Sequence, residues 1–529
     1  MLRNQRNEPC YCGSGHKFKR CHGKIETSTA SNLPPEVERK FREIEAFNRQ
    51  REKQQGHGRP VISEVVQGYR FVAVGSHLLV SNKWKTFHDF LWEYIKKVMG
   101  SEWGNTELQK PAAERHLLLN WYQESAKYIN NHIKERGKVH FIESVGIVSA
   151  YTMLAYNLYL IAHNQRLEGL LLKRLRNQNG FLAAYYEVLV FGALIRAGFE
   201  LDFEDESDES TTHCELTATF KRTGRKFSVE AKMRQAETKS ADIGRQLKKA
   251  LKKCAAHTRI VFVEANIPEE PDDSLRVQSL ERILGDIRRR EDEELAPGIT
   301  LPPAYVVVTN HPYLHFPDKS AKPWALAEGF RIPDFGWGRK YSSIRELVEA
   351  RDRHIEMFAL QKSWEENHRV PSTFDGEIPE FAFGDNPPRL QVGARYNIPD
   401  ENEQNVVAEL QDAVVLEQEK IAYGFYRTED ARNLMASCPL TDDELTAYRE
   451  HPETFFGVLK PNPKPITDAL ELYDCFIAQY RHTPKEKLLE FMGGESLSKE
   501  IRELSHAELT RIYCENLVYT VIVKQGHEK

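Results

Sequence analysis

The stretch CELTATFKRTGRKFSVEAK (Cys214–Lys232) decides the fold that we predict for the middle of the chain. Both of its halves alternate apolar and polar side chains, which is the pattern of strands with one buried face. The segment KRTGRK (221–226) joins them and carries Gly224 at the tip of a hairpin turn. Glu230 and Lys232 share one face of the second strand. This carboxylate and this ammonium form either a surface salt bridge or part of an active site.

A helix and a strand are predicted just before this hairpin. The helix, 181–197, is apolar almost all round and is therefore expected to be buried. Glu187 interrupts it, and a buried carboxylate is costly unless it is paired, hydrogen-bonded or bound to a metal. Gly198 ends the helix, and FELDF (199–203) predicts a strand. Glu187 is thus either a buried ion-pair partner or part of a site.

A second helix and two further strands are predicted after the hairpin. The helix covers about 241–256, and the strands are RIVFVEANIP (259–268) and PAYVVVTN (303–310). The helix carries four lysines, which form either a solvated face or a track for a phosphate backbone. These lysines are Lys248, Lys249, Lys252 and Lys253.

The order of these elements resembles the PD-(D/E)xK nuclease superfamily, the restriction-endonuclease-like fold, over about residues 180–312. The resemblance implies that Glu215 takes the place of the second motif's acid. It implies that Glu230 and Lys232 take the place of the Glu-x-Lys motif. It also implies that Glu187 is the helix acid and that Gln246 corresponds to the glutamine that some members carry on the next helix.

The chain departs from the family pattern at the second motif. The usual Pro-Asp is Cys214-Glu215 here, and a glutamate reaches further than an aspartate. Asp202 and Glu204 are therefore the alternative acids.

The chemistry that the resemblance implies is phosphodiester cleavage with a divalent ion. Mg²⁺ or Mn²⁺ would be held by Glu215 and Glu230, near the main-chain carbonyl of Ala231, because such ions prefer oxygen ligands. Lys232 would orient or deprotonate the water, and its pKa would have to fall if it were the base. The substrate predicted is nucleic acid, DNA in preference to RNA.

The N-terminal segment EPCYCGSGHKFKRCHG (8–23) concentrates metal-binding residues. Three thiols and one imidazole, from Cys10, Cys12, Cys21 and His22, complete a tetrahedral zinc set. Metal binding would supply the folding energy of so short a segment, and chance clustering of cytosolic thiols is the alternative. Residues 7–24 resemble the SEC-C motif, a zinc knob found in the SecA translocase ATPase and other bacterial proteins. That resemblance implies structural zinc and docking to a protein or the ribosome, while the local basic charge would equally favour nucleic acid.

Composition limits the class of protein. The 529 residues are 40% hydrophobic and 29% charged with a net charge of −5, so any nucleic-acid site must be local. No apolar run is long enough to span a membrane, and the start MLRNQRNEPC lacks the apolar core of a signal peptide. Eight cysteines do not make a disulfide scaffold, so a cytoplasmic protein with no membrane contact is expected. No phosphate-loop or zinc-protease motif occurs in the sequence.

The predicted architecture is α+β and multidomain. We expect a zinc knob at 1–28, a mainly helical region at 29–178, a nuclease-like domain with a central mixed sheet at 179–320, and an α-rich accessory region at 321–529. Within these, short strands are predicted over 61–81, single helices over 85–99, 112–135, 144–176 and 343–366, and irregular chain over 369–403. His311 and His315 fall in a loop after the last strand, where they either contact substrate or have no role.

The function predicted is metal-dependent cleavage of nucleic acid, and by analogy with the fold it would suit bacterial defence against foreign DNA. Two alternatives stay open. One is a non-catalytic docking protein with a zinc knob and a degenerate nuclease fold that binds a protein partner or the ribosome. The other is a nucleic-acid binder that does not cleave.

Overall fold

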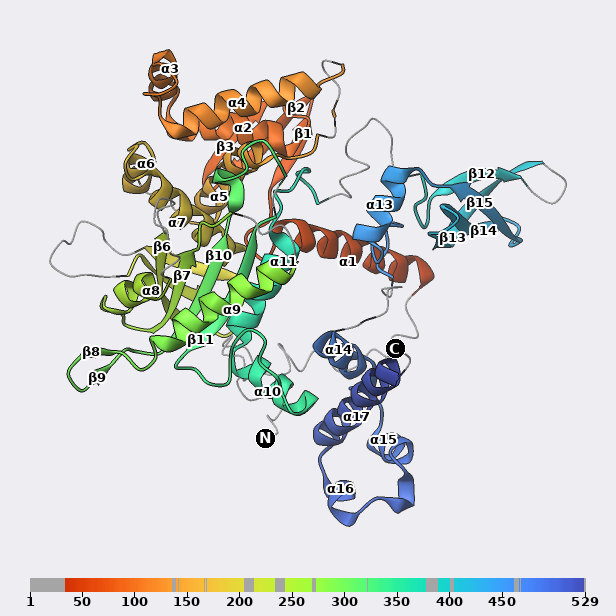
Figure 1. Cartoon of the computed structure of the whole chain (residues 1–529). Coiled ribbons are helices and arrows are strands. Elements are labelled where there is room, and N and C mark those ends of the chain that lie inside the picture. The colour runs from red at the N-terminus through yellow and green to blue at the C-terminus, as the bar shows by residue number, and fades with distance from the viewer. Residues whose placement is uncertain are drawn as a thin grey trace. The chain divides into compact units, whose positions relative to one another are not determined.

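The chain divides into two compact units in the computed structural model (Figure 1). One consists of Met1–Arg49 with Pro388–Asn462, and the larger one of Gln50–Pro387 with Pro463–Lys529. Helix α1 (Pro35–Gln55) spans the boundary between them. The residues that the structure describes are 34–135, 139–140, 142–165, 167, 169–203, 214–233, 243–268, 273–320, 322–376, 389–399, 404–460, 466 and 468–527.

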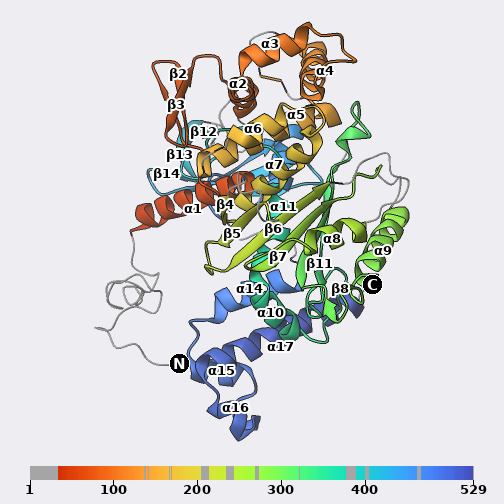
Figure 2. The ribbon, with the colours of Figure 1, turned by 90° about the vertical axis from the view of Figure 1, so that its left-hand side faces the viewer.

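A six-stranded mixed sheet forms the centre of the larger unit (Figure 2). Its spatial order is β11-β10-β7-β6-β5-β4, and β6, β7 and β10 run parallel while each other strand is antiparallel to its neighbour. The strands are β4 (Phe199–Phe203), β5 (Leu216–Phe220), β6 (Lys226–Met233), β7 (Thr258–Glu264), β10 (Ala304–Asn310) and β11 (Trp324–Phe330). The predicted mixed sheet is thus confirmed, and β11 adds an edge strand that lies beyond the predicted domain boundary at residue 320.

Helices cover both faces of this sheet. Helix α7 (Phe181–Arg196) packs on one face with α5 (Gly146–Asn164) behind it, and α8 (Ile243–Leu251) and α9 (Asp273–Arg289) cover the other (Figure 2). Side chains alternate along β6, so Val229 joins the core under α7 while Glu230 faces the α8 side. The alternation read from the sequence therefore decides on which face the acid lies.

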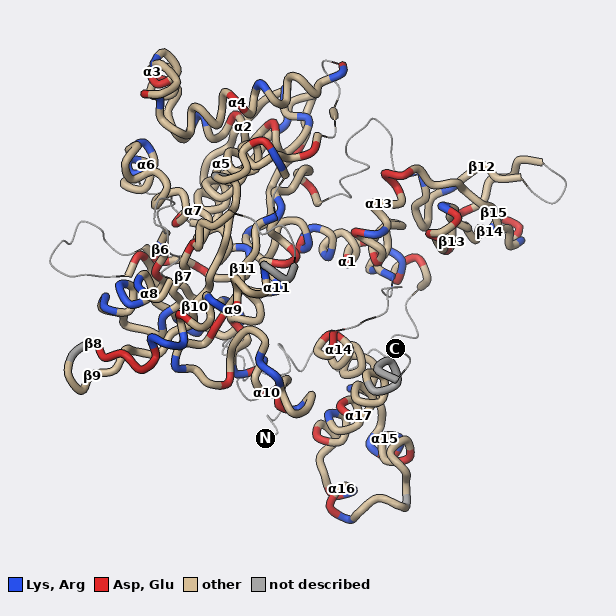
Figure 3. The backbone as a smooth tube through the Cα atoms, viewed as in Figure 1, with Lys and Arg blue, Asp and Glu red and all other residues tan. Residues whose placement is uncertain are grey.

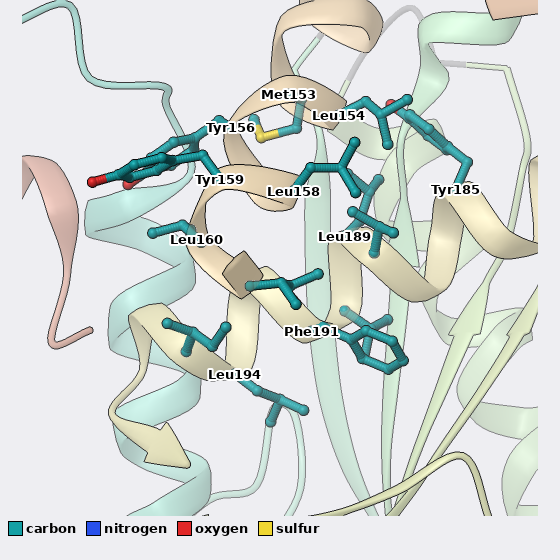
Figure 4. Packing of buried hydrophobic residues seen from close by; sticks show 14 of the residues in the cluster. Met153, Leu154, Tyr156, Leu158, Tyr159, Leu160, Tyr185, Leu189, Phe191 and Leu194 are labelled. Carbon is teal, nitrogen blue, oxygen red and sulfur yellow. The ribbon is translucent and has the colours of Figure 1, made fainter. Parts of the chain in front are cut away.

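Helices α5 and α7 pack against each other through largely apolar side chains. Both helices are buried along most of their length, as expected from their nearly continuous apolar sequence. Figure 4 shows residues of this interface, among them Met153 of α5 and Leu189 of α7. These two helices cover the face of the sheet on which Val229 lies.

The remaining N-terminal part of the larger unit combines a small sheet with helices. The predicted strands over 61–81 are confirmed, but the single helix predicted over 144–176 is two helices, α5 and α6. The elements are β1 (Ser63–Val66), β2 (Tyr69–Val74), β3 (His77–Ser81), α2 (Phe87–Met99), α3 (Ser101–Gln109), α4 (Leu117–His132) and α6 (Gly169–Leu175).

The smaller unit contains a four-stranded antiparallel meander, β12-β13-β14-β15. Strands thus occupy much of 395–439, within the region predicted to be α-rich after residue 321, whereas most other elements of that region are helices. A bulge between Leu410 and Asp412 shifts the register of β13 and interrupts its period-two pattern, which weakens the sequence signal for a strand. The elements are β12 (Arg395–Pro399), β13 (Asn405–Leu416), β14 (Ile421–Thr428), β15 (Asn433–Pro439) and α13 (Asp442–Glu450).

Helices complete the C-terminal part of the larger unit. The helix predicted over 343–366 is divided at His354 into two. Val348, Tyr473 and Cys514 belong to an apolar cluster shared by α10, α14 and α17. The remaining elements are β8 (Glu294–Ala296), β9 (Ile299–Thr300), η3 (Pro312–Leu314), α10 (Ile344–Arg353), α11 (Ile355–Asn367), α14 (Ala469–Tyr480), α15 (Lys485–Phe491), η4 (Gly494–Ser496), α16 (Lys499–Glu503) and α17 (His506–His527).

Membrane-spanning helices are not found among the described residues: none of their helices is both long and apolar enough to cross a bilayer.

Candidate active site

Two carboxylates meet at the β5–β6 hairpin. Glu230 lies within β6 and is 0% exposed, and Glu215 lies just before β5. The Glu215 amide donates to the carbonyl of Val229 (3.0 Å), and the Ala231 amide donates to Glu215 Oε2 (2.7 Å). Gly224, at a φ of 71°, supplies the left-handed residue in the turn that sets this register. The hairpin thus brings together the two acids that the sequence predicts as metal ligands.

Two ammonium groups face these carboxylates. Lys232 Nζ lies 3.3 Å from Glu215 Oε1 and also forms an ion pair with Glu230. Lys253 Nζ lies 2.6 Å from Glu230 Oε1 and 3.6 Å from Glu215 Oε1. The site therefore joins two carboxyl groups and two lysine amino groups from three segments of the chain.

The position of Lys253 corrects the prediction that it lies on a helix face tracking phosphates. Helix α8 ends at Leu251, so Lys253 lies in the turn between α8 and β7. Arg259 Nη2 donates to the carbonyl of Lys253 (2.8 Å) and so helps to hold this turn. After this turn the chain enters β7, which pairs in parallel with β6 so that Thr258 lies opposite Phe227. The turn that carries Lys253 therefore lies beside β6, the strand that carries Glu230.

Burial and the negative charge of Glu215 raise the pKa of Glu230 to about 8. Neither of its carboxylate oxygens has a hydrogen bond of proper geometry among the described residues, although both ammonium groups lie within ion-pair distance of Oε1. These pairs are therefore close charge contacts rather than well-directed hydrogen bonds. Glu230 is a buried carboxylate with unused acceptor capacity, which favours a cation at this position.

Lys232 is an ammonium in this arrangement. Burial lowers its pKa, but the charges of Glu215 and Glu230 outweigh burial and raise it above the ordinary value. A lysine that acts as general base needs the opposite shift. Lys232 is therefore positively charged beside the two carboxyl groups.

Cys214 directly precedes Glu215 and is buried. Burial raises the pKa of its thiol to about 12, and the thiol contacts the carbonyl of Cys254 at 3.5 Å. It stays protonated and is not a thiolate ligand.

A divalent ion that prefers oxygen ligands fits this donor set. Two carboxylates are available, and the carbonyl of Ala231 leaves β6 on the same side as its amide, which contacts Glu215. Mg²⁺ is commonly held by one or two protein carboxylates together with waters and substrate phosphates. Within the described ranges, no group of three or more histidine, cysteine, aspartate or glutamate side chains is arranged to hold a metal.

Glu187 does not provide a third carboxylate ligand in this arrangement. It is buried on α7, and its carboxylate forms an ion pair with Arg174 of α6. The structure thus places the expected helix acid in a paired environment, which offsets the cost of its burial.

The other residues predicted for the site lie around it. Asp202 is exposed on β4 opposite Thr217, and Glu204 lies outside the described residues. Gln246 is half-buried on α8. Lys248 pairs with Glu293 at 2.5 Å. Lys249 and Lys252 are exposed and remain available to a phosphate backbone.

The comparisons with known proteins concern the N-terminal segment. A family model described as the SEC-C motif matches residues 6–24. The predicted zinc ligands Cys10, Cys12, Cys21 and His22 fall within this match and outside the described residues. Neither curated proteins nor solved structures give a match to the chain.

Proposed function

We propose that this chain is a metal-dependent nuclease of the PD-(D/E)xK type. The observation that carries the proposal is the fully buried Glu230 beside Glu215, with Lys232 and Lys253 against both carboxylates. The order of helix, strand, hairpin, helix and parallel strand supports the same assignment.

Each residue of the group has a role in this proposal. Glu215 and Glu230 hold Mg²⁺ or Mn²⁺, which when bound supplies Lewis acidity and lowers the pKa of a coordinated water. Lys232 and Lys253 stabilise the negative charge of the phosphate being cleaved. Both lysines are positioned for this because the carboxylates already hold them at the site.

Nucleic acid is the substrate class, DNA in preference to RNA. Figure 3 shows Lys and Arg along α8 and α9, the helices on the same side of the sheet as Glu230. Two exposed lysines, Lys249 on α8 and Lys252 in the turn after it, offer contacts to a phosphate backbone. A role in bacterial defence against foreign DNA extends this proposal by analogy with the fold.

Cleavage assays on matched variants test the proposal. Supercoiled plasmid, linear duplex, single-stranded DNA and RNA are incubated with the full chain and Mg²⁺ or Mn²⁺. We expect Glu230→Gln and Lys232→Ala to lower cleavage by about 100-fold or more, and Lys253→Ala by about tenfold. Glu328→Gln is the control, because Glu328 is a buried glutamate on β11 of the same sheet, paired with Arg288 at 3.0 Å. It should leave cleavage unchanged.

A docking protein with a degenerate nuclease fold is the second candidate. The observation that favours it is that the two lysine amino groups already pair with the two carboxyl groups. Absence of cleavage with both metals, in folded and zinc-loaded protein, would support this candidate and contradict the nuclease. Equal loss of activity in Glu230→Gln and Glu328→Gln would also contradict a specific role for Glu230.

A further inference from the structure

Strand β15 forms one edge of the meander in the smaller unit. It pairs with β14 along one side, and no strand among the described residues pairs with its other side. A free edge presents backbone N–H and C=O groups that a further strand can use. Charged side chains commonly protect such edges, and the opposite edge strand β12 carries Arg395. The sequence of β15, NLMASCP, contains no charged residue, so this edge is open to pairing.

Hydrogen bonds at the two ends of β15 show which of its backbone groups point away from β14. The amide of Leu440 donates to the carbonyl of Lys420 at 2.8 Å. The amide of Thr428 donates to the carbonyl of Arg432 at 3.0 Å. Because bonding alternates along an antiparallel pair, even-numbered residues of β15 bond to β14 and odd-numbered residues face outward. The outward N–H and C=O groups are those of Asn433, Met435 and Ser437.

Pro439 closes this edge at its far end. It is also odd-numbered, but a proline has no N–H group to donate. Its carbonyl already accepts a hydrogen bond from Arg389 Nη2 at 2.8 Å. The stretch that is open to a partner strand is therefore 433–437.

A second copy of β15 matches this stretch when it runs antiparallel with Met435 opposite its own counterpart. In this register Asn433 lies opposite Ser437 of the other copy, and every outward N–H group meets a carbonyl. A two-fold axis at Ala436 instead would place Asn433 opposite Pro439, which cannot donate and whose carbonyl is already bonded. The edge is thus self-complementary in the register centred on Met435.

Exposed side chains add to this fit. Met435 is 63% exposed and lies opposite Phe425 of β14, which is 43% exposed on the same face. When two copies pair, the two Met435 side chains meet at the centre with a Phe425 on either side. The apolar area that these side chains remove from water favours association.

We propose that β15 is a self-association edge through which two copies of the chain form a continuous antiparallel sheet. The two four-stranded meanders then make one sheet of eight strands, with a two-fold axis at Met435. One strand pair buries less area than a standard interface, so the dimer is weak and exchanges with monomer. This inference goes beyond the proposed nuclease and does not depend on its activity.

Analytical ultracentrifugation of the full chain tests the proposal, from low micromolar to several hundred micromolar protein. We expect the average mass to rise with concentration from that of one chain toward twice that value. A mass that stays at one chain throughout this range overturns the proposal.

Charge variants at the axis test the register. Met435→Lys and Met435→Glu each place two like charges opposite each other, so each variant alone should dimerise at least about tenfold more weakly. An equimolar mixture of the two variants should restore the dimer, because an ammonium then lies opposite a carboxylate. The side chain is exposed, so the melting temperature of each variant should stay close to that of wild type.

Val414→Lys is the matched control. Val414 is 50% exposed on β13 and lies opposite Tyr423 of β14, so the variant adds the same charge to the same face away from the free edge. It should dimerise as wild type does. Equal loss of dimer in Val414→Lys and Met435→Lys would indicate stacking of two apolar faces and would overturn pairing through β15. Met435→Lys that dimerises like wild type, or a mixture that stays monomeric, also overturns it.

Discussion

Glu230 combines the features that make a carboxylate useful to a metal and costly to a fold. It is fully buried, it lies beside a second carboxylate, and burial is the first cause of its raised pKa. The neighbouring ammonium groups reduce this cost without removing the raised pKa. A residue kept in such an environment points to a role outside stability.

This environment predicts a pH-dependent effect of Glu230→Gln on the free energy of unfolding. The pKa of Glu230 is raised in the folded protein, so between the ordinary carboxyl value and about 8 the folded state binds more protons than the unfolded state. Wild-type stability therefore falls as the pH rises through this window. The glutamine variant carries no such loss and should gain on the order of 4 kcal/mol over wild type at about pH 9 relative to about pH 5.

Urea unfolding of metal-free protein across this pH range measures the effect. Glu200→Gln is the control, because Glu200 lies exposed on β4 of the same sheet. Its stability curve should run parallel to that of wild type. A difference between Glu230→Gln and wild type that does not change with pH would contradict the expected titration.

At the scale of single elements, the sequence predicted the hairpin and most of its acids. Period-two alternation in both strands, together with Gly224, fixed the face on which Glu215 and Glu230 meet. Lys253 was misplaced because the helical pattern runs past Leu251, and only the return of the chain into β7 brings this lysine to Glu230. The pairing of Glu187 with Arg174 depends on how α6 packs on α7, which side-chain periodicity does not specify.

The close contact of α5 with α7 gives a prediction at the same scale. A Cβ atom at Gly192 would overlap Asn157, so Gly192→Ala must force the two helices apart or move that amide. We expect a loss of about 1–3 kcal/mol in the free energy of unfolding, as for other overpacked cores.

Gly104→Ala provides the matched control on α3. A Cβ atom there would meet Leu119 only at 3.9 Å, an ordinary contact. Because alanine favours helix over glycine, this change should raise stability by up to about 1 kcal/mol. Chemical unfolding of both variants checks the pair, and a Gly192→Ala protein as stable as Gly104→Ala would contradict the close approach.

At the scale of the whole molecule, the sequence indicated the class but not the grouping of segments. The mixed α+β character follows from local patterns, whereas the pairing of β10 with β11 and the meander β12–β15 depend on contacts between segments. The expected boundary at residue 320 separates two strands that pair. The compact units also each combine early and late parts of the chain, which no local pattern reveals.

The segment that matches the SEC-C motif carries candidate metal ligands of different chemistry from the carboxyl groups of the hairpin. Three thiolates and one imidazole suit zinc, whereas Glu215 and Glu230 suit Mg²⁺ or Mn²⁺. We therefore expect purified chain to hold a single tightly bound zinc ion, measured by elemental analysis after dialysis.

Cys21→Ser should lose this zinc, because it leaves three ligands where a structural site needs four. Cys475→Ser is the matched control, since Cys475 is an exposed free cysteine on α14. It should keep the full zinc content. Equal zinc content in both variants would contradict the assignment of Cys21 as a ligand. Absence of zinc from the wild-type protein would contradict a metal role for the N-terminal cysteines. Loss in Cys21→Ser alone would place the zinc at the N-terminal segment and leave the carboxylates of the hairpin for a second, harder ion.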